Sequence, residues 1–138
     1  MRSPEVAVVI CHHRGDLILR CLDSVYQSQG VTYDVLVISS DETFTHPRAT
    51  VYTVLGGPAH KRNVGVARST ADVIVFLDDD VEVSPYCLYE LKQFLEEHPS
   101  CGMAFAKIYN MERRDEFDDC GSWLTYTGFL WARAGNHQ

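Results

Sequence analysis

The sequence lacks long apolar runs and an excess of positive charge. No run approaches the roughly 20 apolar residues of a membrane-spanning helix, and no basic segment precedes an apolar one as in a signal peptide. Lysine and arginine number 12 against 19 aspartates and glutamates, a formal net charge of −7. Because nucleic acids and anionic membranes are bound by basic surfaces, we do not expect a nucleic-acid partner. The lack of a long apolar run predicts that there is no transmembrane segment. We expect a cytoplasmic protein, with peripheral attachment at the inner face of the membrane as an alternative.

Paired cysteine motifs and glycine-rich phosphate loops are also missing. The five cysteines are an odd number and contain no C-x-x-C pair, which indicates neither a disulfide framework nor a zinc site. No G-x-G-x-x-G follows the first apolar run, and G-x-x-x-x-G-K-[ST] occurs nowhere. A dinucleotide oxidoreductase and a P-loop NTPase are therefore not expected.

Apolar runs alternate with amphipathic segments along the chain. Strands are predicted at 6–10, 34–38, 50–55, 73–77 and 101–109, and a charged loop at 110–119. Helices are predicted from Gly15-Asp16 to a stop at Gly30, over about 59–69, and from Ser84-Pro85 to about His98. This alternation predicts an α/β fold with a mainly parallel sheet flanked by helices, and 138 residues indicate a single domain over 1–138.

Three adjacent aspartates, Asp78, Asp79 and Asp80, follow the most apolar predicted strand. Val73–Leu77 is expected to be buried on both faces at the centre of the sheet, with Asp78 and Asp80 on one side and Asp79 on the other. Ligands of parallel sheets bind at the carboxyl ends of the strands. Clustered carboxylates repel one another, so a divalent cation such as Mg²⁺ or Mn²⁺ is one explanation. An acidic turn that caps the next helix is the other.

Further polar residues are expected at the same edge of the sheet. Ser39, Ser40 and Asp41 follow the second strand, where they form either part of a site or a plain turn. The helix over 59–69 is basic and tolerates Gly65 in its middle, at a cost of about 1 kcal/mol relative to alanine. This pattern indicates a close approach to a neighbour, or else a solvated basic face.

Two motifs, in order and on the expected elements, resemble those of a known family. The first is G-G-P-A-x-x-R-N-x-G at 56–65, and the second is V-I-V-F-L-D-D-D-V-x-V-x-P at 73–85. Together with V-V-I near the start and the first strand–helix–strand unit, they are similar to family 2 glycosyltransferases of the GT-A fold. The resemblance covers essentially the whole chain.

The resemblance implies a nucleotide-sugar donor, for example a UDP-, GDP- or dTDP-sugar, and a glycan, lipid-linked or protein acceptor. It implies that Asp80, with Asp78, holds Mg²⁺ or Mn²⁺ on the donor diphosphate. Asp78 and Asp79 would face ribose, sugar or metal-bound water, and Arg62, supported by Asn63, would lie near the base or phosphates. The remaining implied donor contacts are Cys11, His12 and His13 beside the base, and Ser39, Ser40 and Asp41 on base or ribose.

The chain departs from the family pattern in two short stretches. Family members usually carry a Pro-Thr-Tyr-Asn-like stretch where this chain has Cys11-His12-His13-Arg14. They often carry Asp-Asp-Gly or Ser-Asp-Gly where it has Ser39-Ser40-Asp41. These differences leave the nucleotide undetermined.

The family reaction is an inverting displacement that needs a general base for the acceptor hydroxyl. In the family this carboxylate lies further along the domain than this chain extends, and Asp118 and Asp119 are poor substitutes. We therefore expect the donor-binding half of the domain, incomplete at its C-terminus. The aromatic stretch 123–131 is expected to be covered by a dimer partner or a downstream domain.

Two other functions remain open from the residues. One is a non-catalytic module that binds nucleotide-sugar or metal. The other is an aspartate-nucleophile phosphatase of the haloacid dehalogenase type, with Asp78 as nucleophile and Asp80 as acid/base.

Overall fold

The structure is a computed structural model that describes residues 4–119, 121–124 and 130–132. The chain divides into two compact units, Met1–Lys92 and Gln93–Gln138, and each is considered by itself. No helix in the described part of the chain is both long and apolar enough to cross a bilayer.

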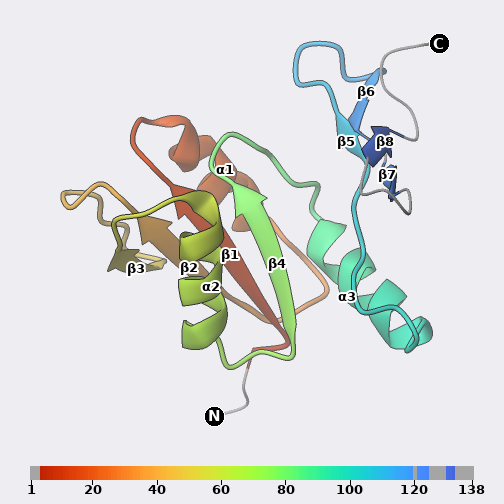
Figure 1. Ribbon diagram of the computed structural model, residues 1–138, viewed down its shortest axis with the longest axis horizontal. Helices are drawn as coiled ribbons and strands as arrows, with labels where there is room; N and C mark the ends of the chain where they lie inside the picture. Colours follow the sequence, from red (N-terminus) through yellow and green to blue (C-terminus); the bar gives the residue numbers. More distant parts are fainter. Residues whose placement is uncertain (1–3, 120, 125–129, 133–138) are drawn as a thin grey trace. The chain divides into compact units, whose positions relative to one another are not determined.

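The first unit is built on a four-stranded parallel sheet in the order β3-β2-β1-β4 (Figure 1). The strands are β1 (Val6–His12), β2 (Tyr33–Ser39), β3 (Thr50–Thr53) and β4 (Val73–Asp78). Helices α1 (Leu17–Val25) and α2 (Pro58–Arg68) connect them, and α3 (Cys87–Glu97) follows β4. The predicted α/β fold with a mainly parallel sheet is confirmed.

Apolar side chains fill both faces of this sheet, because the residues of β1 alternate between them. Val6, Val8 and Ile10 pack with the apolar stripe of α1, which consists of Ile18, Cys21, Leu22 and Val25, and with Leu88 of α3. Ala7 and Val9 pack on the opposite face with Leu36 and Ile38 of β2 and with Val64 of α2. Helices cover both faces, so β1 and β2 are buried almost throughout.

The prediction that Val73–Leu77 lies at the centre of the sheet is wrong. In the described structure β4 pairs only with β1 and forms an edge, and β1 takes the central place. Phe76 accordingly keeps 43% of its surface exposed. A run of apolar residues indicates how much of a strand's surface can be buried. It does not indicate which other strands pair with that strand.

Two predicted helix limits are also wrong. Helix α1 ends at Val25, five residues before Gly30, because Tyr26 already closes the last turn through its backbone N–H. Gly30 has φ +80° and occupies a later turn against Tyr89. Helix α3 begins at Cys87 and not at Pro85, because the Cys87 N–H donates to the Ser84 carbonyl and closes a separate turn.

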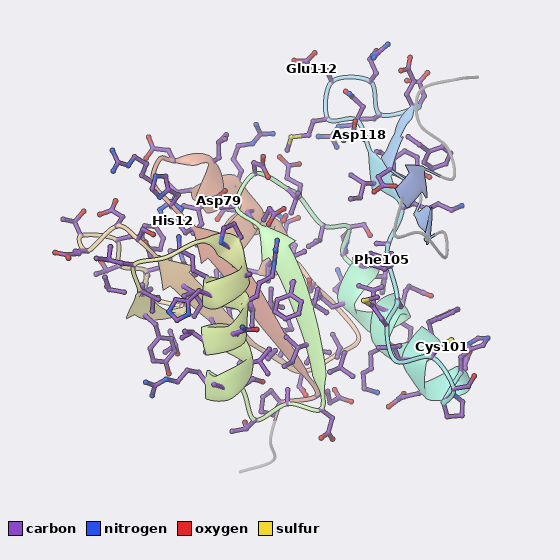
Figure 2. The ribbon with its side chains drawn as sticks, viewed as in Figure 1. His12, Asp79, Cys101, Phe105, Glu112 and Asp118 are labelled. Carbon is purple, nitrogen blue, oxygen red and sulfur yellow. The ribbon has the colours of Figure 1, made fainter. Side chains whose placement is uncertain are left out.

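The second unit contains two small antiparallel pairs after the end of α3. Strand β5 (Ile108–Tyr109) pairs with β6 (Phe117–Asp119), and β7 (Ser122–Leu124) pairs with β8 (Leu130–Ala132). The predicted strand over 101–109 is wrong except at its last two residues, and the predicted loop over 110–119 ends as a strand. Met103 and Phe105 are exposed, so the apolar residues of this segment do not mark a buried strand. Figure 2 labels Phe105 in this segment. Cys120 and residues 125–129 of the predicted aromatic stretch lie outside the described residues.

Candidate functional site: a cavity at the carboxyl ends of β1 and β4

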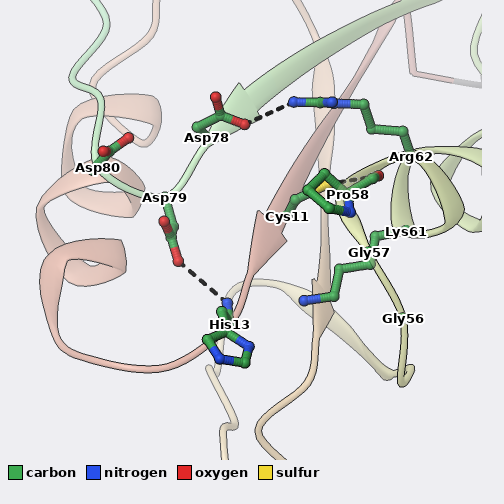
Figure 3. A pocket seen from close by; sticks show the side chains of 10 residues that line it. All are labelled: Cys11, His13, Gly56, Gly57, Pro58, Lys61, Arg62, Asp78, Asp79 and Asp80. Atoms are coloured by element: carbon green, nitrogen blue, oxygen red, sulfur yellow. Dashed lines mark hydrogen bonds and ion pairs between the residues drawn. The ribbon is translucent and has the colours of Figure 1, made fainter.

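A cavity of about 570 Å³ opens where β1 and β4 end. The register of the sheet places Cys11 beside Asp78, so the residues after both strands meet there. Ten residues line it: Cys11, His13, Gly56, Gly57, Pro58, Lys61, Arg62, Asp78, Asp79 and Asp80. The acidic side chains lie on one side, and Lys61, Arg62 and the Gly56–Pro58 turn lie on the other (Figure 3). This is the edge of the sheet at which a ligand was expected.

The three aspartates have separate surroundings. Asp78 accepts a hydrogen bond from the Arg62 guanidinium at 2.9 Å, and Asp79 accepts one from His12 at 2.8 Å (Figure 3 shows the first). Asp80 is exposed and, among the described residues, has no hydrogen-bond or ion-pair partner. Protein groups therefore donate hydrogen bonds to two of the three carboxylates and leave the third open to the cavity.

The position of the triplet excludes one of the two sequence interpretations. β4 ends at Asp78, and Asp79 and Asp80 form a turn, so the strand alternation expected for all three applies only to the first. Helix α3 begins seven residues after Asp80, so the triplet does not cap that helix.

The three residues after Ile10 divide between the cavity and the interior, as alternation on a strand requires. Cys11 and His13 line the cavity, whereas His12 is buried on the other side of β1. The His12 ring packs 4.7 Å from the Phe44 ring, centroid to centroid. Its Nδ1–H donates to Asp79, since an ionised carboxylate can only accept. Its buried Nε2 has no partner among the described residues.

The Cys11 thiol lies 3.8 Å from the Pro58 carbonyl oxygen and is partly buried. Burial raises the pKa of Cys11 above its ordinary value, and Arg62 opposes this only in part. Cys11 is therefore held as a thiol at neutral pH. A nucleophilic thiolate would need the opposite shift.

The residues after β2 form a closed turn and do not line the cavity. The Ser39 hydroxyl accepts a hydrogen bond from the Asp41 N–H at 2.9 Å. The Asp41 carboxylate accepts bonds from the hydroxyl and backbone N–H of Thr43, and these lower the pKa of Asp41. The Ser40 N–H donates to the His12 carbonyl. Asn63 is exposed on α2 and also does not line the cavity. The predicted contacts with the donor therefore stay predictions for Ser39–Asp41 and for Asn63.

Lys61 also lines the cavity, although the sequence analysis did not single it out. Its side chain is only 4% exposed, and its ammonium donates to the His12 carbonyl oxygen. The signal in the sequence is its spacing: Lys61 and Gly65 are four residues apart and share the face of α2 that packs on the sheet. Gly65 approaches β1 so closely that an added Cβ would lie 2.3 Å from Val9 Cγ1. The close approach predicted from this glycine is thus to the sheet.

The acidic side of the cavity fits a hard divalent cation. Among the described residues there is no group of three histidine, cysteine, aspartate or glutamate side chains that would by itself enclose a metal ion. Mg²⁺ needs no such group, since it usually binds through one or two carboxylates together with substrate phosphates and water. Asp78 and Asp80 are exposed at the cavity and supply oxygen ligands of that type.

Comparison with known proteins decides the family. A sequence profile described as Glycosyl transferase family 2 matches residues 6–129. This chain belongs to glycosyltransferase family 2. No curated protein sequence matches this family member significantly. The family assignment confirms the resemblance found in the two motifs, and it replaces the phosphatase interpretation of Asp78 and Asp80.

Solved structures support the same fold. The crystal structure of S. aureus TarS 1-349 has a TM-score of 0.60 and 19% identity, over 69% of this chain and 33% of that one. A second crystal structure of S. aureus TarS has a TM-score of 0.60 and 16% identity, over 77% of this chain and 24% of that one. The family 2 chain therefore spans a third or less of these proteins, and at this identity the likeness shows the GT-A-type α/β fold alone.

Proposed function

We propose that this chain is the donor-binding part of a metal-dependent glycosyltransferase. It would bind a UDP-, GDP- or dTDP-sugar and support inverting transfer of the sugar to a hydroxyl group of a glycan, lipid-linked or protein acceptor. Asp80 carries the proposal, because this carboxylate faces the cavity without a partner among the described residues. Family membership supports glycosyl transfer as the reaction class.

The residues around the cavity have distinct roles in this proposal. Asp78 and Asp80 would hold Mg²⁺ or Mn²⁺, which when bound stabilises negative charge on the departing nucleoside diphosphate. Arg62, already hydrogen-bonded to Asp78, would fix the direction of that carboxylate. Cys11 and His13 form the wall beside the donor, and the closed turn at Ser39–Asp41 supports the end of β2.

Transfer also requires a group that removes the proton of the acceptor hydroxyl. The cavity carboxylates belong to the donor side of the proposed reaction, and Asp118 and Asp119 are exposed on the short strand β6. We assign no base among these residues. We accordingly expect this chain alone to bind donor well and to transfer sugar slowly.

The direct test is Asp80→Ala. Calorimetry with UDP, GDP and dTDP, with and without Mn²⁺, should show Mn²⁺-dependent binding of at least one nucleotide to the unchanged protein. The substitution should weaken that binding by more than the roughly 10- to 100-fold typical of changes outside the metal's own ligands. Asp72→Ala is the matched control, because Asp72 is exposed at the opposite end of the same strand. Equal Mn²⁺-dependent affinity in the Asp80 variant would refute the assignment.

The same preparation separates a transferase from a module that only binds. Donor consumption in the presence of a mixed acceptor panel, even if slow, supports transfer. Tight donor binding with no hydrolysis and no transfer at any protein concentration supports the binding module.

A further inference from the structure

Lys61 is a buried cation that no carboxylate in the described part of the chain neutralises. Its side chain is 4% exposed, and the described residues provide a single acceptor for its ammonium, the His12 carbonyl oxygen. The other cation of the cavity, Arg62, already pairs with Asp78. Burial of an unpaired charge is unfavourable, so buried cations in proteins normally have an anionic partner. For Lys61 the described residues supply no such partner.

The surroundings of Lys61 favour an anion supplied by a ligand. Lys61 lines the cavity together with Gly56, Gly57 and Pro58, which lead into the first turn of α2. Gly57, the N-cap residue, has no side chain that could satisfy the free N–H groups of that turn. The positive end of the helix dipole and the ammonium therefore lie on the same side of the cavity, opposite the aspartates (Figure 3).

We propose that Lys61 is the diphosphate-binding residue of the cavity, its ammonium contacting the donor phosphate nearest the first turn of α2. This inference rests on the proposed function and adds to it a second way of neutralising the diphosphate, independent of the metal ion. The donor diphosphate would lie between the Asp78–Asp80 side and the Lys61 side. One N–H of the ammonium donates to the His12 carbonyl oxygen, and the other two remain available to donate to the diphosphate.

A competing explanation is purely structural. The ammonium joins α2 to the carboxyl end of β1 through the His12 carbonyl, and this alone could account for its burial. The two explanations differ in ligand selectivity. A structural tie affects every ligand of the cavity equally, whereas a phosphate contact affects only ligands that carry the phosphate.

The first experiment uses inorganic pyrophosphate in buffer with EDTA, so that no divalent ion contributes. Phosphorus-31 NMR titration should show weak binding to the unchanged protein. Lys61→Met, which keeps the length of the side chain and removes its charge, should weaken it by about tenfold or more. Lys61→Arg should retain part of it. Arg68→Met is the matched control, because Arg68 is a cation in the last turn of the same helix and stacks on Tyr52.

The second experiment compares nucleoside, monophosphate and diphosphate with Mn²⁺ present. Lys61→Met should lower diphosphate affinity by about tenfold or more and leave nucleoside affinity unchanged. Equal losses for all three ligands, or no loss for any, would overturn the proposal. Pyrophosphate binding without metal can succeed even if Mn²⁺-dependent nucleotide binding is absent, so failure of the proposed function is distinguishable from failure of this inference.

A measurement on the unchanged protein covers the case in which Lys61→Met does not fold. The carbon-13 NMR signal of the Lys61 Cε should shift when pyrophosphate is added in EDTA. The signal of Lys92 should not, because Lys92 pairs with Glu5 just before β1, at the far end of that strand. A stationary Lys61 signal at saturating pyrophosphate, or no pyrophosphate binding at all, would contradict the proposal.

Discussion

At the scale of single residues, His12 shows how one buried side chain can organise the cavity from outside it. Its ring is 1% exposed and packs on Phe44, while its Nδ1–H reaches the Asp79 carboxylate (Figure 2). The resemblance to the family implied a contact of His12 with the base, and this contact stays a prediction. In the structure His12 supports the acidic turn through Asp79.

We expect His12→Ala to lower the free energy of unfolding by about 2–4 kcal/mol, because it removes a buried ring as well as a hydrogen bond. His12→Phe keeps a ring against Phe44 and removes the buried nitrogen that lacks a partner. Its cost should be smaller, about 1 kcal/mol. Urea unfolding followed by far-ultraviolet circular dichroism measures both. Equal losses in the two variants would contradict the importance of the ring contact.

Cys11 offers a chemical probe of the cavity. Burial raises its pKa, so the reactive thiolate is scarce at neutral pH and alkylation should become faster as pH rises. Mn²⁺ with a bound nucleoside diphosphate should slow alkylation of Cys11 and leave that of exposed Cys101 unchanged. Cys21, whose pKa burial raises to about 12, should stay unmodified throughout. Peptide mass mapping gives the three rates, and an unprotected Cys11 would count against a ligand in this cavity.

At the scale of elements, the close packing of α2 on β1 fixes the position of the cavity's basic side. The four parallel strands were predictable, because short apolar runs that alternate with amphipathic helices are typical of a parallel sheet. The edge position of β4 was not, since it depends on pairing partners. The ends of α1 and α3 depend on backbone turns at Tyr26 and Ser84, which side-chain patterns do not record.

Gly65→Ala tests this packing. Alanine favours a helix by about 1 kcal/mol over glycine, yet the added Cβ would meet Val9 Cγ1 at 2.3 Å. We expect a net loss of about 1–3 kcal/mol in the free energy of unfolding, as for other overpacked cores. Val9→Ala in the same chain should relieve the clash, so the double variant should lose less than the sum of the single losses. Additive losses, measured by urea unfolding, would show that the helix and strand are not in contact here.

At the scale of the whole molecule, the site is contained in the first unit, since every residue that lines the cavity lies within Met1–Lys92. The sequence predicted that the aspartate triplet would lie at the carboxyl ends of the strands, where the cavity is found, because strand ends can be read from residue patterns. It did not predict Lys61, whose role depends on which face of α2 meets the sheet. Nor did it predict that His12, Asn63 and Ser39–Asp41 would lie off the cavity wall, which follows from side-chain directions and turn closure.

The central claim is that a divalent ion and a nucleoside diphosphate occupy the cavity beside Asp80. Paramagnetic broadening by Mn²⁺ in the NMR spectrum, with whichever of UDP, GDP or dTDP binds, tests this most directly. We predict broadening of the amide signals of Cys11, His13, Gly57 and Asp78–Asp80, while those of Asp34 and Asp72 at the opposite end of the sheet stay sharp. Broadening centred elsewhere, or none on addition of nucleotide and Mn²⁺, would contradict the account.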